Sequence, residues 1–177
     1  MNKVWINKMK IIDNKAITFW VTGLSGSGKT TFAYYLQNEL KKTKAVSLII
    51  DGDEIRDILK YKNSYSKEER LELAYQYSNL AKLINKQNIN VICSTISLFH
   101  EIHEYNRNNI DRYCEIFLDK DLNEIKNIDK KNIYKKNKNV VGVDLKAEFP
   151  KKPDYTIKNE KDHIIIAANI IKRFPNL

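Results

Sequence analysis

The chain has 177 residues, of which 42% are hydrophobic and 30% are charged. This composition is typical of a globular protein and excludes a disordered chain, and the length fits one domain of ~100–200 residues. No run approaches the ~18 consecutive apolar residues of a membrane-spanning helix. Residues 1–15 mix Lys and Asn into every apolar run, unlike a signal peptide. We therefore expect a cytoplasmic protein without a membrane partner.

The net charge is +9, from 31 basic and 22 acidic residues. The basic residues are mostly Lys spread along the whole chain, whereas nucleic-acid binders gather them on one face. We therefore expect a solvated or anion-binding surface and do not expect nucleic acid as a partner. The two cysteines, Cys93 and Cys114, are too few for a disulfide scaffold or a Cys-rich zinc site.

Strand and helix patterns alternate along the sequence. Apolar, β-favouring runs predict strands at 17–22, 46–50, 89–93, 113–118 and 155–157. Helical spacing predicts helices at 28–42, 53–60, 66–87, 98–109 and 162–173, with short helical pieces at 121–127 and 130–136. Such alternation indicates an α/β fold, with a five-stranded parallel sheet flanked by helices. No linker interrupts it, so we expect a single domain over 1–177 with its core at about 17–174.

Several helices carry more specific expectations. Ser66 and Glu69 form the pattern of a capping box at the start of the long helix. A core-facing stripe is predicted along that helix at Leu71, Ala74, Ser78, Ala81 and Leu83. His100 and His103 share one face of a polar helix and are expected to be solvated. We expect the run at 164–166 to lie in the core. Any exposed part of this run would offer a contact surface for a homodimer.

One motif points to nucleotide phosphate. Residues 23–30, Gly-Leu-Ser-Gly-Ser-Gly-Lys-Thr, fit the P-loop pattern G-x-x-x-x-G-K-[ST] between a predicted strand and a predicted helix. Such glycines let backbone N–H groups point at phosphate oxygens, the Lys reaches the β- and γ-phosphates, and the Thr hydroxyl serves Mg²⁺. We expect ATP to be bound by Gly23, Ser25, Gly26, Ser27, Gly28, Lys29, Thr30 and Thr31.

Asp51-Gly52-Asp53 follows the second predicted strand. Ligands of open α/β sheets lie beyond the carboxyl ends of the strands, so both carboxylates should face the P-loop crevice. A phosphoryl transferase needs one carboxylate for Mg²⁺ and one to orient or deprotonate the acceptor hydroxyl. We assign Thr30 and Asp51 to the metal and Asp53 to the acceptor. The alternative is an Asp-Gly turn with a helix N-cap, and Asp53 could serve both roles.

The sequence resembles the adenylyl-sulfate kinase family collinearly from about residue 18 to 158. The matching pieces are Val21 to Thr31, Asp51 to Arg56, Val91 to Ser94, Ile96-Ser97, Asp129 to Lys136 and Gly142 to Asp144. The resemblance implies a P-loop kinase fold with a lid at about 128–150. It also implies transfer of the γ-phosphate of ATP, with Mg²⁺, to the ribose 3′-hydroxyl of a nucleotide acceptor.

The family's site residues carry over position by position. Asp53 matches the acidic residue beside the acceptor hydroxyl, and the resemblance with the P-loop makes Asp53 and Lys29 the catalytic residues. Arg56 and Arg70 match arginines that grip the acceptor's phosphate, and Lys131 matches a lid lysine near the transferred phosphate. The expected substrate-binding residues are Asp53, Arg56, Tyr65, Arg70, Ile96, Ser97 and Lys131.

The base-facing positions depart from the family. The aromatic pair that holds adenine reads Tyr65 and Val140 here, and an adenine-binding Asn and a nearby Arg become Leu73 and Tyr75. The Phe before Ile96 becomes Thr95, and the Pro-Tyr-Arg after Ser97 becomes Leu-Phe-His. This pattern resembles the branch that phosphorylates cytidine diphosphoramidate, a precursor of capsule phosphoramidate.

Two other functions stay open at this point. The first is an adenylyl-sulfate kinase of sulfate assimilation, which the incomplete aromatic pair argues against. The second is a nucleotide-binding regulatory or RNA-binding protein, which would keep the P-loop without phosphorylating an acceptor and would bind polynucleotide with a steep dependence on salt.

Overall fold

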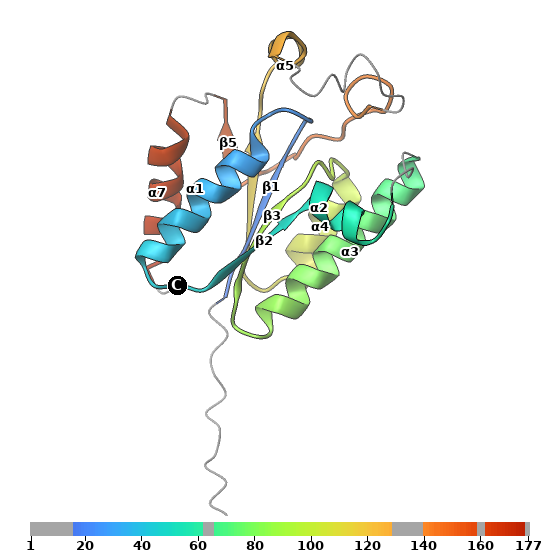
Figure 1. Cartoon of the computed structure of the whole chain (residues 1–177). Coiled ribbons are helices and arrows are strands. Elements are labelled where there is room, and N and C mark those ends of the chain that lie inside the picture. The colour runs from blue at the N-terminus through green and yellow to red at the C-terminus, as the bar shows by residue number, and fades with distance from the viewer. Residues whose placement is uncertain (1–15, 62–65, 129–139, 159–161, 176–177) are drawn as a thin grey trace, which may run out of the picture.

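The computed structural model describes residues 16–61, 66–128, 140–158 and 162–175. Within them, parallel strands form one sheet in the order β2-β3-β1-β4-β5 (Figure 1). The strands are β1 (Thr18–Gly23), β2 (Ser47–Asp51), β3 (Asn90–Ser94), β4 (Tyr113–Leu118) and β5 (Tyr155–Ile157). The helices are α1 (Lys29–Lys42), α2 (Gly52–Ile58), α3 (Lys67–Asn85), α4 (His100–Asn109), α5 (Leu122–Ile128) and α7 (His163–Lys172).

The predicted α/β fold is confirmed. Every predicted strand and helix in the described residues is present, with bounds that differ by at most two residues. The helical piece expected at 130–136 lies outside the described residues. In the described part of the chain, no helix is long and apolar enough to cross a membrane.

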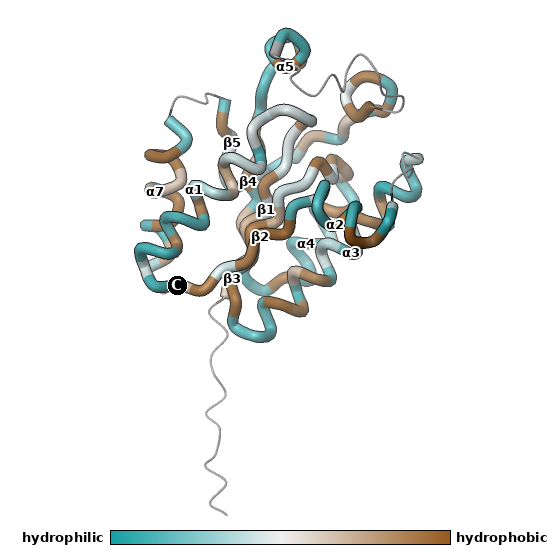
Figure 2. Tube along the Cα trace, viewed as in Figure 1, coloured by the Kyte–Doolittle hydropathy of each residue, from teal (hydrophilic) through white to brown (hydrophobic). Residues whose placement is uncertain are grey.

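Helices cover both faces of the sheet. Helices α1 and α7 pack together on one face, and α3 and α4 lie on the other (Figure 1). Along β1, Phe19 and Val21 belong to the core under α1 and α7, whereas Trp20 belongs to the core under α3 and α4. Because both faces are buried, β1 is apolar without alternation, as is typical of parallel strands. Figure 2 shows the central strands between helices whose colour alternates between hydrophilic and hydrophobic residues.

Two expectations about buried helix faces are wrong in part, although Ala74, Ser78 and Ala81 are buried and Ile166 packs against the core. Leu83 is 58% exposed, whereas Leu73 and Tyr77 are buried. Leu83 follows the buried Ala81 by only two residues, which places it about 200° further round the helix. On α7 the consecutive isoleucines at 164 and 165 are also exposed, because three neighbouring residues of a helix cannot all face one core.

The predicted capping box at the start of α3 is confirmed. Ser66 Oγ accepts a hydrogen bond of 3.2 Å from the Glu69 backbone N–H, and the Glu69 carboxylate accepts one of 3.1 Å from the Ser66 N–H. The backbone N–H of Arg70 donates to the Ser66 carbonyl in the same turn. The cap therefore fixes the first turn of the helix that carries Arg70.

We expect Ser66→Ala to lower the free energy of unfolding by about 1 kcal/mol, because the variant leaves the Glu69 N–H without its side-chain acceptor. Ser66→Asp, which keeps an N-cap acceptor, should stay within about 0.5 kcal/mol of the parent protein. Urea denaturation followed by circular dichroism measures both. Equal losses in the two variants would contradict a role for the cap in stability.

Candidate active site

The register of three strands defines one edge of the sheet. Ser94 of β3 pairs with Val21 of β1 on one side and with Asp51 of β2 on the other. The segments that follow these residues therefore leave the sheet at the same level, and the Thr22 hydroxyl donates a hydrogen bond to the carbonyl of Ile96 across this edge. Ligands of open α/β sheets bind at such an edge.

The loop between β1 and α1 has the geometry of a phosphate site. Gly28 is the N-cap residue of α1, and its φ of 92° lies in the left-handed region. The backbone of the loop leads directly into the N-terminal end of α1, which favours anions. Ser27 Oγ is buried and, within the described residues, has no hydrogen-bond partner. Lys29 Nζ donates to the Leu24 carbonyl over 2.7 Å, so its ammonium lies over the loop. These features fit a bound phosphate chain.

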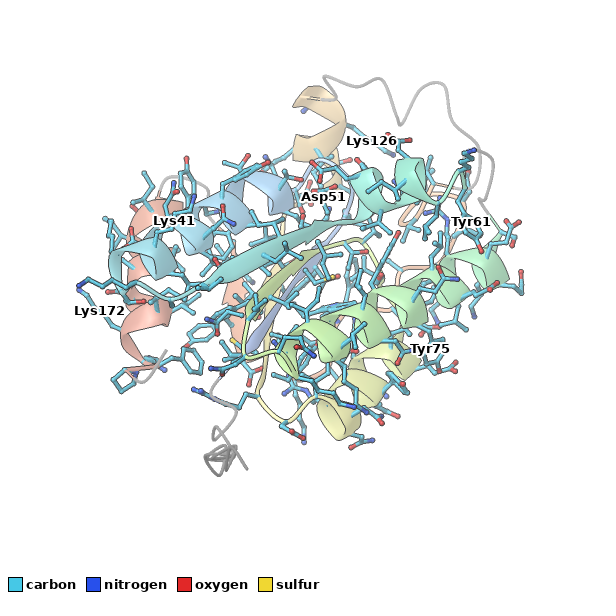
Figure 3. The ribbon with its side chains drawn as sticks, turned by 60° about the horizontal axis from the view of Figure 1, so that its bottom comes forward. Lys41, Asp51, Tyr61, Tyr75, Lys126 and Lys172 are labelled. Carbon is cyan, nitrogen blue, oxygen red and sulfur yellow. The ribbon has the colours of Figure 1, made fainter. Side chains whose placement is uncertain are left out.

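Thr30, in the first turn of α1, and Asp51, at the end of β2, are in contact at this edge of the sheet. Thr30 Oγ1 donates to Asp51 Oδ2 over 2.8 Å, and Asp51 is largely buried at the end of β2 (Figure 3). Asp51 Oδ1 also accepts from the Asp53 backbone N–H over 2.9 Å, so Asp51 is the N-cap of α2. The N-cap role considered for Asp53 therefore belongs to Asp51. A hydroxyl and a carboxylate held together are oxygen ligands suited to Mg²⁺.

Asp53 lies in the first turn of α2 with its carboxylate facing solvent. Its side chain is 63% exposed and forms an ion pair with Arg56, one turn further along the helix. Arg56 is more buried and extends into a hollow beside α2. The acidic group and the cation are therefore adjacent, and the cation lines that hollow.

The hollow opens to solvent. It contains four of the predicted substrate-binding residues, from three parts of the chain. Its lining residues are Arg56, Arg70, Leu73, Tyr77, Thr95, Ile96, Ser97, Leu98, Phe99 and Val141. Positive charge therefore adjoins an apolar wall, a combination suited to an anionic group attached to a ring. Tyr65 and Lys131 lie outside the described residues, so their roles stay predictions.

Two hydroxyl groups line the hollow beyond β3. Thr95 Oγ1 and Ser97 Oγ lie 2.8 Å apart in a hydrogen bond, and both residues are buried. Ser97 has a φ of 24°, which is rare for a residue with a side chain and costs about 1–3 kcal/mol. The surrounding structure must therefore hold this turn in place.

Sequence reasoning missed Tyr77 as part of the site. Its hydroxyl donates to the Gly52 carbonyl over 3.2 Å and so joins α3 to the start of α2. Burial raises the pKa of Tyr77 to about 12, so the hydroxyl keeps its proton at neutral pH. Arg70, Leu73 and Tyr77 follow one another at three- and four-residue spacing, which is the signal that could have placed Tyr77 beside Arg70.

The residues that depart from the family divide into two groups. Leu73 and Thr95 line the hollow. The Tyr75 hydroxyl instead donates to Glu101 of α4, and Tyr75 lies on the outer side of α3 (Figure 3). His100 is bonded through Nε2 to the Phe149 carbonyl, 2.9 Å away, and does not line the hollow. Val141 lines it, although the sequence comparison indicated Val140.

The expectation that His103 is solvated is wrong. The residue is only 5% exposed, because α4 packs this side against polar groups of the sheet rather than against solvent. Its Nε2 atom lies 3.2 Å from the Ser97 carbonyl oxygen. A polar residue on a polar helix is thus part of the buried structure behind the hollow. Cys93 of β3 and Cys114 of β4 are both buried.

Residues 15–158 match the family model described as adenylylsulphate kinase. The chain belongs to the adenylylsulphate (APS) kinase family. It is 40% identical over 151 residues to cytidine diphosphoramidate kinase of Campylobacter jejuni, covering 82% of this chain and 88% of that relative. It is 33% identical over 162 residues to adenylyl-sulfate kinase of Clostridium acetobutylicum, covering 88% and 81%.

The fold agrees with this family. The APS kinase of Mycobacterium tuberculosis, solved in complex with AMPPNP and APS, superposes with a TM-score of 0.82 at 27% identity. The match covers 89% of this chain and 96% of that chain. As a member of the APS kinase family, the chain is a nucleotide kinase, a phosphotransferase with a hydroxyl group as acceptor.

The P-loop of this APS kinase family member depends on a close backbone approach at Gly23. A Cβ there would lie 2.7 Å from the Leu118 carbonyl oxygen and 2.8 Å from Ser27 Oγ. We expect Gly23→Ala to lower the free energy of unfolding by at least about 2 kcal/mol, because a backbone oxygen cannot move aside.

Gly52→Ala is the matched control for stability. A Cβ at Gly52 would lie 3.3 Å from Thr95 Oγ1, a side-chain atom that can shift slightly. Its cost should stay within about 1 kcal/mol. Thermal unfolding of both variants measures the difference, and equal stabilities would contradict the close packing described for Gly23.

Proposed function

We propose that this kinase transfers the γ-phosphoryl group of ATP to the ribose 3′-hydroxyl of a cytidine nucleotide with an anionic tail, namely cytidine diphosphoramidate. One observation carries the proposal. The hollow next to the P-loop combines Arg56 and Arg70 with an apolar wall, and Arg56 is ion-paired with the Asp53 carboxylate. The groups proposed to bind phosphate and the wall proposed to bind the ring are thus adjacent.

The P-loop is the proposed ATP site. Its backbone N–H groups and the N-terminal end of α1 would bind the phosphates, and Lys29 would leave the Leu24 carbonyl to reach the β- and γ-phosphates. Thr30 and Asp51 would hold Mg²⁺, which would offset the negative charge of those phosphates. The complex of the M. tuberculosis relative with AMPPNP supports this assignment.

The segment after residue 140 supports the proposed lid at 128–150. Gly142 lies against the P-loop, because a Cβ at this position would be 2.7 Å from Leu24 Cδ2. Val141 and Leu24 also share one buried apolar cluster. We propose that Lys131 acts from this lid near the transferred phosphate.

Asp53 is the proposed acceptor-side base. Its carboxylate would accept the proton of the 3′-hydroxyl as that oxygen bonds to the γ-phosphorus and the bond from phosphorus to the bridging oxygen of ADP breaks. Arg56 now neutralises this carboxylate. The acceptor's anionic tail would compete for Arg56 and Arg70, because guanidinium groups bind phosphate in a bidentate manner. Tail binding would thereby release Asp53 for the hydroxyl.

The apolar wall supports a pyrimidine over a purine. Leu73 stands where the family has an adenine-binding Asn, and with Val141 it offers contact area without hydrogen bonds to a base edge, which suits a smaller ring than adenine. We propose that Tyr65 stacks on one side of the base. The 40% identity with cytidine diphosphoramidate kinase of C. jejuni supports the same choice.

The first test concerns Asp53. Asp53→Asn keeps the size of the side chain and removes the charge that accepts the proton, so kcat should fall at least ~100-fold. The dissociation constant for ATP should change less than about twofold, because Asp53 lies on α2 beside the proposed acceptor site and not in the P-loop. A coupled ADP-release assay and calorimetry measure the two quantities.

Asp57→Asn is the matched control, because Asp57 is exposed on the same helix one turn from Asp53. This variant should keep the parent kcat. An Asp53→Asn enzyme with parent kcat, or one that loses ATP binding while its saturated rate is unchanged, would contradict the proposed role.

The second test concerns the acceptor. With equal ATP and Mg²⁺, kcat/KM for cytidine diphosphoramidate should exceed that for adenylyl sulfate at least ~10-fold, because the apolar wall lacks contacts to an adenine edge. Cytidine diphosphate serves as a third acceptor that isolates the contribution of the tail. A higher kcat/KM for adenylyl sulfate would show an adenylyl-sulfate kinase, and turnover of neither acceptor would refute both.

A further inference from the structure

The carbonyl oxygen of Ser97 is held from two directions. It accepts a hydrogen bond of 3.0 Å from the Phe99 backbone N–H, which closes a three-residue turn. It also lies 3.2 Å from Nε2 of His103, in the first turn of α4. A carbonyl oxygen can only accept, so the His103 proton must be on Nε2 for this bond to form. The His103 ring therefore supports the strained turn from behind the hollow.

An ionic network, buried at Glu115 and partly exposed at Arg107 and Asp154, lies on the opposite side of the ring. His103 Nδ1 lies 3.7 Å from Oε1 of Glu115, a residue of β4 whose side chain is almost completely buried. Arg107 donates to Glu115 over 3.0 Å and to Asp154 over 3.2 Å. Asp154 in turn accepts from the Glu115 backbone N–H over 2.7 Å. The network thus joins α4, β4 and the start of β5 behind the ring.

The ring is neutral in the folded protein. Burial lowers the pKa of His103 to about 4, although the hydrogen bond to Ser97 opposes the shift. Burial also raises the pKa of Glu115. Nδ1 therefore carries no proton, and it is buried without a hydrogen bond among the described residues. The only proton of the ring is directed at Ser97.

We propose that His103 is a positioning residue of the acceptor site, which holds the Ser97 turn, and with it the Thr95–Ser97 hydroxyl pair, in the geometry that contacts the acceptor. The inference rests on the proposed function, because it takes the hollow as the acceptor site. The ring does not touch the hollow and acts through the Ser97 carbonyl. The Glu115–Arg107–Asp154 network lies behind the ring, with Glu115 Oε1 at 3.7 Å from Nδ1.

Two variants separate positioning from simple packing. The amide nitrogen of His103→Gln lies where Nε2 lies and can still donate to Ser97, whereas the shorter amide of His103→Asn cannot reach. We expect His103→Asn to raise the KM for the acceptor at least ~10-fold while the KM for ATP changes less than about twofold. His103→Gln should recover most of the acceptor KM. Steady-state kinetics with the best acceptor of the parent enzyme measures both.

Ile170→Ala is the control for lost stability, because Ile170 is buried in the core on the opposite face of the sheet. This variant should unfold more easily than the parent and keep both KM values. If His103→Asn leaves the acceptor KM unchanged, or His103→Gln is as impaired as His103→Asn, the inference is wrong while the proposed function stands. If the parent enzyme phosphorylates no nucleotide, the proposed function itself fails.

A pH profile of stability gives a readout independent of activity. The folded pKa of about 4 lies below the unfolded value of about 6.5, so the unfolded chain binds the His103 proton first as the pH falls. His103 should therefore lower the free energy of unfolding of the parent protein as the pH falls from 6.5 to 4. The profile of His103→Gln should lack this decrease. The charged and titratable groups around the ring are Glu115, Tyr113, Arg107, His100 and Glu148. Identical profiles for parent and variant would contradict a neutral, buried His103.

Discussion

Ser94 of β3 is in register with Val21 of β1 and with Asp51 of β2. Because all these strands are parallel, the chain leaves each of them toward the same edge, and the P-loop, α2 and the Ser97 turn converge there. The Thr22–Ile96 and Thr30–Asp51 hydrogen bonds then join neighbouring segments across the edge. Shifting one strand by a single residue would separate these groups and turn its side chains to the opposite face.

The two halves of the site are stabilised in different ways. The P-loop depends on backbone geometry, since Gly23 packs against a carbonyl and Gly28 adopts a left-handed conformation. The acceptor half depends on side chains from several elements, among them the Tyr77 bond to the Gly52 carbonyl and the His103 bond to Ser97. A family can keep the first half nearly constant and alter the second, because changes in the hollow leave the backbone of the P-loop intact. This division agrees with relatives named for two different nucleotide substrates.

The fold could be predicted because its signals are local. Strands buried on both faces are continuous apolar runs, and the capping box at Ser66 depends on residues within a four-residue segment. Strand order depends on contacts between distant segments, so periodicity alone did not provide it. The burial of His103 was missed for the same reason: its helix is polar, and only the tertiary structure shows that Glu115 of β4 lies behind it. The convergence of Arg56 and Arg70 was expected from resemblance, whereas Thr95, Tyr77 and Phe99 joined them through packing.

The proposed reaction adds phosphate to the ribose of a nucleotide whose anionic tail binds Arg56 and Arg70. Phosphorus and proton NMR of the product formed from cytidine diphosphoramidate and ATP tests it most directly, because scalar coupling identifies the carbon that bears the new phosphate. We expect a phosphomonoester coupled to the ribose H3′, with the diphosphoramidate tail unchanged. A new phosphate on the tail, or release of inorganic phosphate without any new ester, would contradict it.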